Sequence, residues 1–232
     1  MLTIEKIVSD GWEAAIRGMR NPKNSWYLSD SKWIALTDNP THPHDFRYEL
    51  GPNDLDLCLR LNKAGSEHRK FVRMIHISFD VVAPIFWWAE HDTYKVATTR
   101  NSCSKMHKIH VKPFSMDDFS HEGCDKVPYA KAALEDVIRA CEHLRQDFNE
   151  TGNRECWRAL IELLPEGYNM RATWDGSLET LLQQCHQRNG HKLKEEWEPY
   201  LAALFENIPY LGEYYDALYG KKSVKEVDEN GN

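Results

Sequence analysis

An alternation of apolar and polar side chains in residues 71–81 constrains the fold more than any other feature of the sequence. The apolar side chains stand at odd-numbered positions, with Arg73 as the exception: Phe71, Ile75, Ile77, Phe79 and Val81. Polar side chains stand between the last four of them, namely His76, Ser78 and Asp80. A period of two is the pattern of a β-strand that buries one face. We therefore predict a strand over residues 71–81.

Helical patterns occupy most of the remaining chain. The segment 12–20 is predicted to be a helix that Asp10 caps, and a second helix begins at Pro52. Gly65 suits the left-handed residue that follows the end of a helix. More helical segments follow, with Gly or Pro at most junctions: 128–148, 153–164, 177–188, 191–206 and 210–219. The sequence thus predicts an α+β fold in which a small antiparallel sheet is accompanied by a majority of helices.

The size and composition of the chain favour one domain. With 232 residues and 41% hydrophobic side chains, it is long enough to bury one sizeable core. We predict a single domain over residues 1–220. The segment 221–232 combines charges, Gly and Asn with only two valines, so we expect a disordered tail.

Hydropathy, net charge and cysteine usage exclude several classes of protein. No apolar run approaches the roughly 20 residues that a membrane-spanning helix needs, so we expect a cytoplasmic protein with no membrane partner. The formal net charge of −7 disfavours non-specific nucleic-acid binding. The cysteines include no Cys-x-x-Cys pair and are expected to be reduced thiols: Cys58, Cys103, Cys124, Cys141, Cys156 and Cys185.

The segment 90–107 concentrates groups that bind phosphate. It holds Lys95, Arg100 and Lys105 together with hydroxyls, an amide, a thiol and imidazoles. These cations, with the hydroxyls and backbone amides of residues 101–104, form a set that is typical of anion sites. The alternative is a solvated loop whose charges bind no ligand.

The order of motifs in residues 59–105 resembles the core signature of the flavin-dependent thymidylate synthases. The family pattern is a helix, a Gly/His loop, a strand, Ala-Pro-x-Phe, Gln-x-x-Arg-His-Arg and Ser-x-Asn-Glu-x-Ser-x-Arg-Tyr. This chain has Ala83-Pro84-Ile85-Phe86, which places Glu90 at the family's Gln and Thr93-Tyr94-Lys95 at its Arg-His-Arg. In the same register, His68 takes the position of the flavin-contacting histidine.

The similarity continues downstream and covers roughly residues 59–205. Leu163-Leu-Pro165 and Ser177-Leu178 are similar to the family's Leu-Pro and Ser-Leu. Arg188, followed by 191–196, takes the place of its nucleotide-binding arginine.

This resemblance implies a nucleotide site and a flavin site. The substrate-binding positions are occupied by Glu90, Arg100, Asn101, Ser102, Cys103, Ser104, Lys105 and Arg188. The cofactor-binding positions are occupied by His68, Thr93, Tyr94 and Lys95. Lys95 and Arg188 take positions for which the resemblance implies a catalytic role.

The resemblance implies a nucleotide-binding protein that transfers a one-carbon unit to C5 of dUMP or a related pyrimidine deoxynucleotide. FAD, NADPH and methylene-tetrahydrofolate are the cofactors that it implies, and a homotetramer is the assembly. In that tetramer, Lys95 and Lys105 of one chain would approach Arg188 of another. The alternatives are a non-catalytic nucleotide binder, because Thr-Tyr-Lys replaces the charged triplet, and an interaction protein without a ligand.

Two further clusters admit more than one interpretation. Cys103 lies among cations that favour a thiolate, although a plain buried cysteine is the simpler reading. Cys103, His107 and His110, completed by His121 or Cys124, would form a zinc site.

Trp87 and Trp88 are adjacent aromatic residues. They suit core or interface packing, with stacking on a flavin or a base as the alternative. Left exposed on a monomer, they would favour a homo-oligomer.

Overall fold

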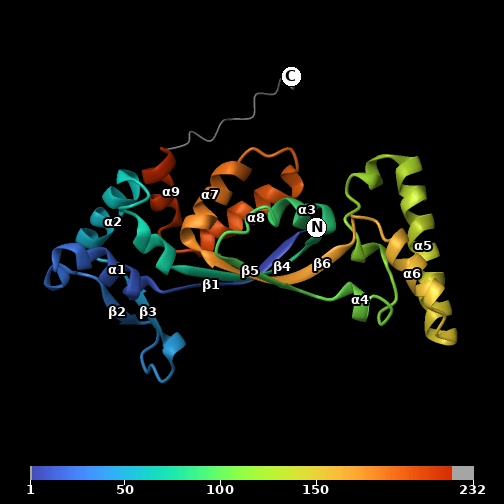
Figure 1. The fold of residues 1–232 in the computed structure, drawn as a ribbon, viewed down its shortest axis with the longest axis horizontal. Helices are drawn as coiled ribbons and strands as arrows, with labels where there is room; N and C mark the ends of the chain where they lie inside the picture. The colour runs from blue at the N-terminus through green and yellow to red at the C-terminus, as the bar shows by residue number, and fades with distance from the viewer. Residues whose placement is uncertain (1, 221–232) are drawn as a thin grey trace, which may run out of the picture.

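The computed structural model describes residues 2–220, apart from the side chain of His44, and is built on a four-stranded antiparallel sheet (Figure 1). The strands lie in the order β1-β4-β6-β5: β1 (Thr3–Asp10), β4 (His76–Pro84), β6 (Asn169–Ser177) and β5 (Thr98–Ser102). A separate hairpin joins β2 (Lys32–Ala35) to β3 (Phe46–Glu49). The predicted α+β class with a small antiparallel sheet is confirmed. The predicted tail 221–232 lies outside the described residues.

The two central strands bury one face of the sheet. β4 buries Ile77, Phe79 and Val81, and β6 presents Trp174 directly opposite Phe79. The two rings stack with centroids 4.9 Å apart. Three helices cover this face (Figure 1): α3 (Ile85–His91), α7 (Leu178–Arg188) and α8 (Lys194–Asn207).

The opposite face of the sheet is polar. Arg171 pairs with Glu5 and, at 2.8 Å, with Asp80. Thr173 also donates a hydrogen bond of 2.6 Å to Asp80. At the edge formed by β1, a bulge between Glu5 and Val8 interrupts the pairing, and Lys6 there has a φ of 55°.

The predicted strand over 71–81 is correct only in its second part. Residues 70–74 form a 3-10 turn, and β4 begins at His76 and runs on to Pro84. Phe71 and Val72 are both buried, which does not fit the expected strand with one buried face, and Arg73 pairs with Glu179. The strands β1, β2, β3, β5 and β6 were not expected from the sequence.

The predicted long helices are present, with ends that differ by at most three residues. They are α1 (Trp12–Arg20), α2 (Pro52–Ala64), α5 (Pro128–Thr151), α6 (Arg154–Leu163), α7, α8 and α9 (Leu211–Tyr219). The expected cap at Asp10 is wrong, because Gly11 caps α1 in a left-handed conformation with a φ of 84°. Gly65 follows α2 with a φ of 130°, outside the left-handed helical region that we expected.

The helices α5 and α6 pack against each other beside the main body (Figure 1). They enclose a small second core around Ile109, Cys141 and Leu160. No helix within residues 2–220 is both long and apolar enough to cross a membrane. The cysteines form no disulfide, as the sequence predicted.

Trp87 and Trp88 belong to the core of the chain itself. Their exposed fractions are 0% and 1%, and Trp87 packs against Trp197 and Tyr200 with ring centroids about 5 Å away. Core packing is therefore confirmed, and stacking on a flavin or base is wrong. The expectation that these rings would drive oligomerisation is also wrong, because the chain buries them unaided.

A buried ion pair fixes α1 against α2. Arg20 donates from Nε to Oδ1 of Asp54 at 2.6 Å, and both side chains are buried. The hydroxyls of Ser29 and Ser31 each donate to Oδ2 of Asp54 at 2.6 Å. Burial acts to raise the pKa of Asp54, but the hydrogen bonds from Ser29, Ser31 and Arg20 outweigh it and hold the pKa below its ordinary value.

Asp54→Asn should therefore destabilise the protein strongly. The variant leaves the Arg20 guanidinium buried without a counter-ion, which costs about 3–5 kcal/mol of unfolding free energy. Urea unfolding monitored by tryptophan fluorescence measures the loss. Asp56→Asn is the matched control, because Asp56 makes an exposed pair with Arg60 and its loss should cost at most about 1 kcal/mol. Equal effects of the two substitutions would contradict this role of Asp54.

Candidate functional site

The residues that the sequence predicted to form one site fall into three groups, of which the first two share Tyr94. The Arg188 cluster contains Glu90, Thr93, Tyr94 and Arg188. The loop cleft contains Lys95 and Arg100. The strand-end pocket contains Cys103, Ser104 and Lys105.

The Arg188 cluster is a network within one chain. Arg188 lies at the last turn of α7, and its Nη1 pairs with Oε2 of Glu90 at 2.7 Å. Its Nη2 donates to the backbone carbonyl of Glu90 at 3.2 Å and to the hydroxyl of Thr93 at 3.4 Å. The guanidinium carbon also lies 5.4 Å from the ring centre of Tyr94 and 5.0 Å from that of Trp197. Arg188 is thus held as a cation between two aromatic faces.

The loop that follows α3 lies along α7. The Tyr94 hydroxyl donates to Gln187 at 3.0 Å near the end of α7, and Thr180 at its beginning donates to the carbonyl of Val96 at 3.3 Å. Ala97 follows with a φ of 55°, a conformation that a side chain disfavours. The loop is therefore held in a fixed shape over the helix.

The loop cleft has a volume of about 290 Å³ and lies between this loop and the sheet. Its lining consists of His91, Asp92, Tyr94, Lys95, Thr98, Arg100 and Trp174. Arg100 pairs with Asp92 at 2.9 Å and lies over the ring of Trp88 at 4.8 Å. Lys95 is exposed and makes no ion pair with any described residue. The cleft therefore offers one available cation, and its second cation is already neutralised.

His91 is a buried imidazole beneath the loop cleft. Tyr200 donates its hydroxyl proton to Gln184 at 2.7 Å, so the contact of 3.3 Å between Tyr200 and Nε2 of His91 requires the proton on Nε2. Nδ1 is then a buried acceptor with no partner among the described residues. Burial, together with the nearby charges of Arg100 and Arg188, lowers the pKa of His91 to about 3. His91 is neutral in the folded protein at neutral pH.

The strand-end pocket lies where β5 leaves the sheet. Its volume is about 200 Å³, and its lining consists of Val82, Cys103, Ser104, Lys105, Lys108, Ile109, Tyr168, Asn169, Met170 and Arg171. Ser104 caps the short helix α4 (Lys105–Lys108) by accepting a hydrogen bond from the backbone of His107. Lys105 and Lys108 form no ion pair with other described residues. The pocket therefore combines an apolar floor with two available cations and a hydroxyl.

The other predicted residues lie outside these groups. Asn101 is exposed on the polar face of the sheet, and Ser102 is half-buried on the opposite side of β5. His68 is exposed in the turn after α2, beside Arg69, which pairs with Glu179 in the first turn of α7. Arg188 lies nine residues further along that helix, roughly 13 Å at 1.5 Å per residue. The structure does not join His68 to Thr93 and Tyr94.

Sequence reasoning missed part of the strand-end pocket. Lys108 follows Lys105 by three residues, so the spacing of a helical turn gave a usable signal. Tyr168 and Arg171 come from β6, a strand that the sequence analysis did not recognise. The proposed zinc site is not supported, because no cluster of metal ligands occurs among residues 2–220. Cys103 is exposed, so the reading of a plain buried cysteine is wrong.

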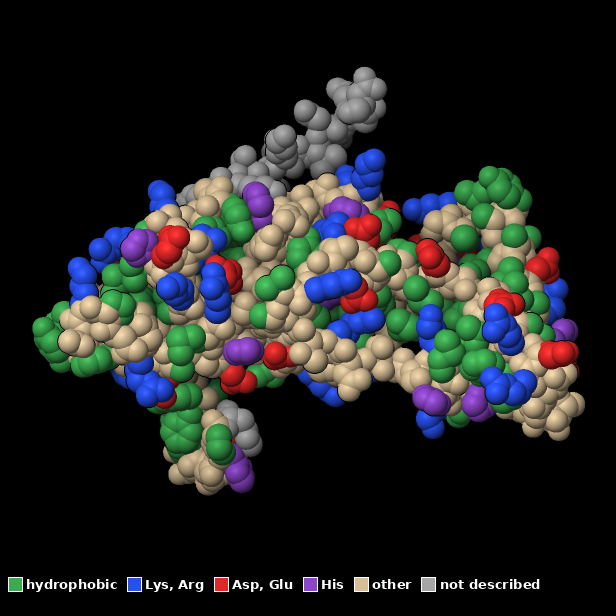
Figure 2. Space-filling view, in the orientation of Figure 1, with side chains coloured by type: hydrophobic (Ala, Val, Ile, Leu, Met, Phe, Trp, Pro, Cys, Tyr) green, Lys and Arg blue, Asp and Glu red, His purple; other side chains and the backbone are tan. Residues whose placement is uncertain are grey.

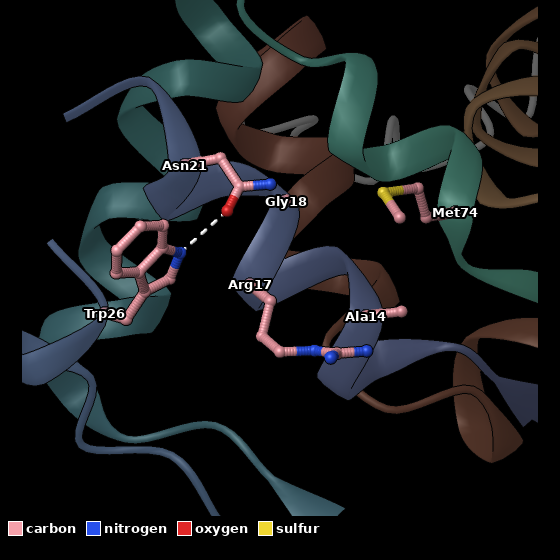
Figure 3. Close-up of a pocket in the computed structure, with 6 residues that line it drawn as sticks. All are labelled: Ala14, Arg17, Gly18, Asn21, Trp26 and Met74. Atoms are coloured by element: carbon pink, nitrogen blue, oxygen red, sulfur yellow. Dashed lines mark hydrogen bonds between the residues drawn. The ribbon is translucent and has the colours of Figure 1, made fainter. Parts of the chain in front are cut away.

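A further groove of about 510 Å³ runs along α1 (Figure 3). Figure 3 shows Arg17 and Trp26 on its sides, with the Trp26 indole donating to Asn21 at 2.7 Å. Near this end of the molecule, hydrophobic side chains gather on the β2–β3 hairpin (Figure 2), among them Trp33 and Phe46. None of the predicted site residues lines this groove.

Comparison with solved structures identifies the fold. Thymidylate synthase X (ThyX) from Helicobacter pylori with FAD and dUMP superposes with a TM-score of 0.67 at 16% identity, covering 94% of this chain and 100% of that one. A second structure of the flavin-dependent thymidylate synthase ThyX from the same organism, complexed with FAD and dUMP, gives a TM-score of 0.65 at 16% identity, with coverages of 92% and 100%. No model of a known protein family and no curated protein sequence matches. The expected fold is therefore confirmed.

Protonation of His91 should make stability depend on pH. The unfolded chain binds a proton near the ordinary pKa of 6.5, whereas the folded chain does so only at about 3, so the unfolded state binds more protons between these values. Stability should fall as the pH is lowered through this window, by up to about 1.4 kcal/mol per pH unit.

Urea unfolding at pH 6.5 and pH 5 measures this dependence. His91→Gln should show a smaller loss of stability between the two pH values than the unmodified protein, whatever its absolute stability. An identical loss in both proteins would show that His91 is not protonated on unfolding in this range.

Proposed function

We propose that the protein binds a pyrimidine deoxynucleoside monophosphate of the dUMP type in the strand-end pocket. The observation that carries the proposal is the pair of lysines, Lys105 and Lys108, which lie at the rim of an apolar pocket and have no carboxylate partner among residues 2–220. The resemblance of the fold to structures that hold dUMP supports the same ligand.

The phosphate would lie against the cationic rim. Lys105 and Lys108 supply charge, and the Ser104 hydroxyl, whose oxygen accepts from His107, keeps its proton free to donate. Arg171 also borders the pocket, but Glu5 and Asp80 already engage it. We therefore assign the phosphate to the two lysines.

The pyrimidine ring would lie over the apolar floor. Val82, Ile109 and Met170 supply this surface, and Tyr168 adds a half-buried ring. Asn169 has a buried Oδ1 that accepts no hydrogen bond from the part of the chain that the structure describes. This amide oxygen is available to accept from a ring N–H.

The residues at the expected flavin positions fit a flavin poorly. The Thr93 hydroxyl donates to the carbonyl of Glu90 at 2.8 Å, and Tyr94 is buried with its hydroxyl donating to Gln187. His68 is exposed at the other end of α7. Lys95 and His68 make no side-chain hydrogen bond or ion pair with a described residue, but His68 lies away from the other three positions. We therefore propose binding of the nucleotide without assigning a step to FAD, NADPH or methylene-tetrahydrofolate.

A second candidate function is flavin-dependent one-carbon transfer to the bound nucleotide. It is favoured by one observation, that both solved structures with this fold hold FAD together with dUMP. Binding of FAD would then require the loop over α7 to release Thr93 and Tyr94 from their contacts within the chain.

The predicted homotetramer remains a proposal. Its support is the family resemblance described in the sequence analysis. The cytoplasmic location is likewise proposed, on the sequence features given above.

Replacement of the two lysines should weaken nucleotide binding. Each charged hydrogen bond is worth about 1.5–3 kcal/mol, so Lys105→Gln with Lys108→Gln should raise the Kd for dUMP by at least about tenfold. Isothermal titration calorimetry measures the change. Lys63→Gln, at an exposed lysine of α2, is the matched control and should leave the Kd unchanged. An unaltered Kd in the double variant would remove the strand-end pocket as the site.

The absorption spectrum separates the two candidate functions. The nucleotide binder should be colourless as purified and take up no added FAD, because Thr93 and Tyr94 at the flavin positions are engaged within the chain. A band near 450 nm that bleaches on anaerobic addition of NADPH would establish the flavin-dependent alternative instead.

A further inference from the structure

We infer that Glu90 is a specificity-determining residue, whose carboxylate acts as an internal counter-ion and keeps phosphate-bearing ligands off Arg188. The Arg188 cluster has the composition of an anion site. Its cation, however, is already paired with a carboxylate of the same chain at 2.7 Å.

The geometry makes Glu90 a competitor for any anion. Arg188 is 13% exposed in its side chain, whereas Glu90 is 43% exposed, so the carboxylate is the more accessible member of the pair. A phosphate that approaches from solvent meets the negative charge of Glu90 before it reaches Arg188. Binding would require displacement of the carboxylate from its partner.

The Arg188 side chain is held in place by further contacts, which oppose its rotation away from Glu90. Its guanidinium lies between the rings of Tyr94 and Trp197, at 5.4 Å and 5.0 Å. Tyr94 is itself fixed by its hydrogen bond to Gln187. The backbone carbonyl of Glu90 accepts a second hydrogen bond from the same guanidinium, so the residue is held at both its main chain and its side chain.

Replacement of the Glu90 carboxylate by an amide would change the net charge of the pair with Arg188 from zero to positive. A glutamine side chain keeps the size of glutamate and can still accept a hydrogen bond from Arg188, but it carries no charge. The cluster would then hold one uncompensated cation near the surface. We therefore expect Glu90→Gln to gain binding of anions rather than lose it.

The test uses inorganic phosphate and dUMP as probes of the full-length protein. Glu90→Gln should bind inorganic phosphate at least tenfold more tightly than the unmodified protein by calorimetry. Glu90→Gln combined with Arg188→Gln should return to the affinity of the unmodified protein, because the gain depends on Arg188. A gain that persists in the double variant, or the absence of any gain in a folded Glu90→Gln variant, would overturn the inference.

A matched control removes a carboxylate from another arginine. Glu162 pairs with Arg158 at 2.8 Å on the exposed side of α6, so Glu162→Gln changes the net charge equally, and its phosphate affinity should stay within twofold of the unmodified protein. A gain equal to that of Glu90→Gln would reduce the effect to net charge and overturn the inference.

A second variant covers the case in which Glu90→Gln does not fold. Arg188→Gln leaves Glu90 half-exposed and hydrated, so it should fold. Because Arg188 is already neutralised, this variant should bind dUMP within twofold of the unmodified protein, and a tenfold loss would overturn the inference.

The inference deepens the proposed function but can fail separately from it. The strand-end pocket is tested by the lysine variants, whereas Glu90 is tested by a gain that depends on Arg188. If dUMP does not bind at the lysines, phosphate binding to Glu90→Gln still decides the role of Glu90. If dUMP binds and Glu90→Gln shows no gain, only the role of Glu90 is lost.

Discussion

The antiparallel pairing of β4 with β6 is the interaction on which the rest of the structure depends. It runs without interruption from His76 opposite Ser177 to Pro84 opposite Asn169. Because side chains alternate along both strands, one register places the stacked rings of Phe79 and Trp174 on one face and the ion pair of Asp80 and Arg171 on the other. A shift by one residue would exchange these faces, so the pairing decides where the helices pack.

The same pairing places the candidate sites. α3 follows β4 directly and α7 follows β6 directly, so Glu90 and Arg188 arrive together at the ends of two helices that cover one face. β5 pairs with the other side of β6 and delivers Ser104 to the strand-end pocket. Residues 93–95 and 103–105 are close together in the sequence, but the sheet places them in different parts of the molecule.

The sequence predicted the helices well because each carries its own signal. Pro52 begins α2, and the apolar periodicity of α5 to α9 is local. The strands were harder to predict, because a strand gives only a short sequence pattern or is defined by its pairing with a neighbouring strand. β6 does alternate, with Met170, Ala172 and Trp174 buried, but β5 is polar throughout and is recognisable only from its pairing with β6.

The candidate site was predictable in its residue types but not in its grouping. Density of cations and hydroxyls in residues 90–107 indicated an anion site, and the structure distributes these groups over the loop cleft and the strand-end pocket. No local pattern indicates that Asp92 would neutralise Arg100, or that Glu90 would neutralise Arg188 across 98 residues. Such pairings are set by the tertiary fold, and they decide which cations remain available.

The two edges of the main sheet carry features that oppose pairing with strands of another molecule. An exposed edge offers unpaired backbone groups to another chain and is a common starting point for aggregation. Here the bulge at Lys6 breaks the regular backbone of β1, and β5 carries only polar side chains with Arg100 at its centre. Within residues 2–220, neither edge of this sheet therefore presents the flat, apolar template that fibrils require, which disfavours strand pairing between molecules.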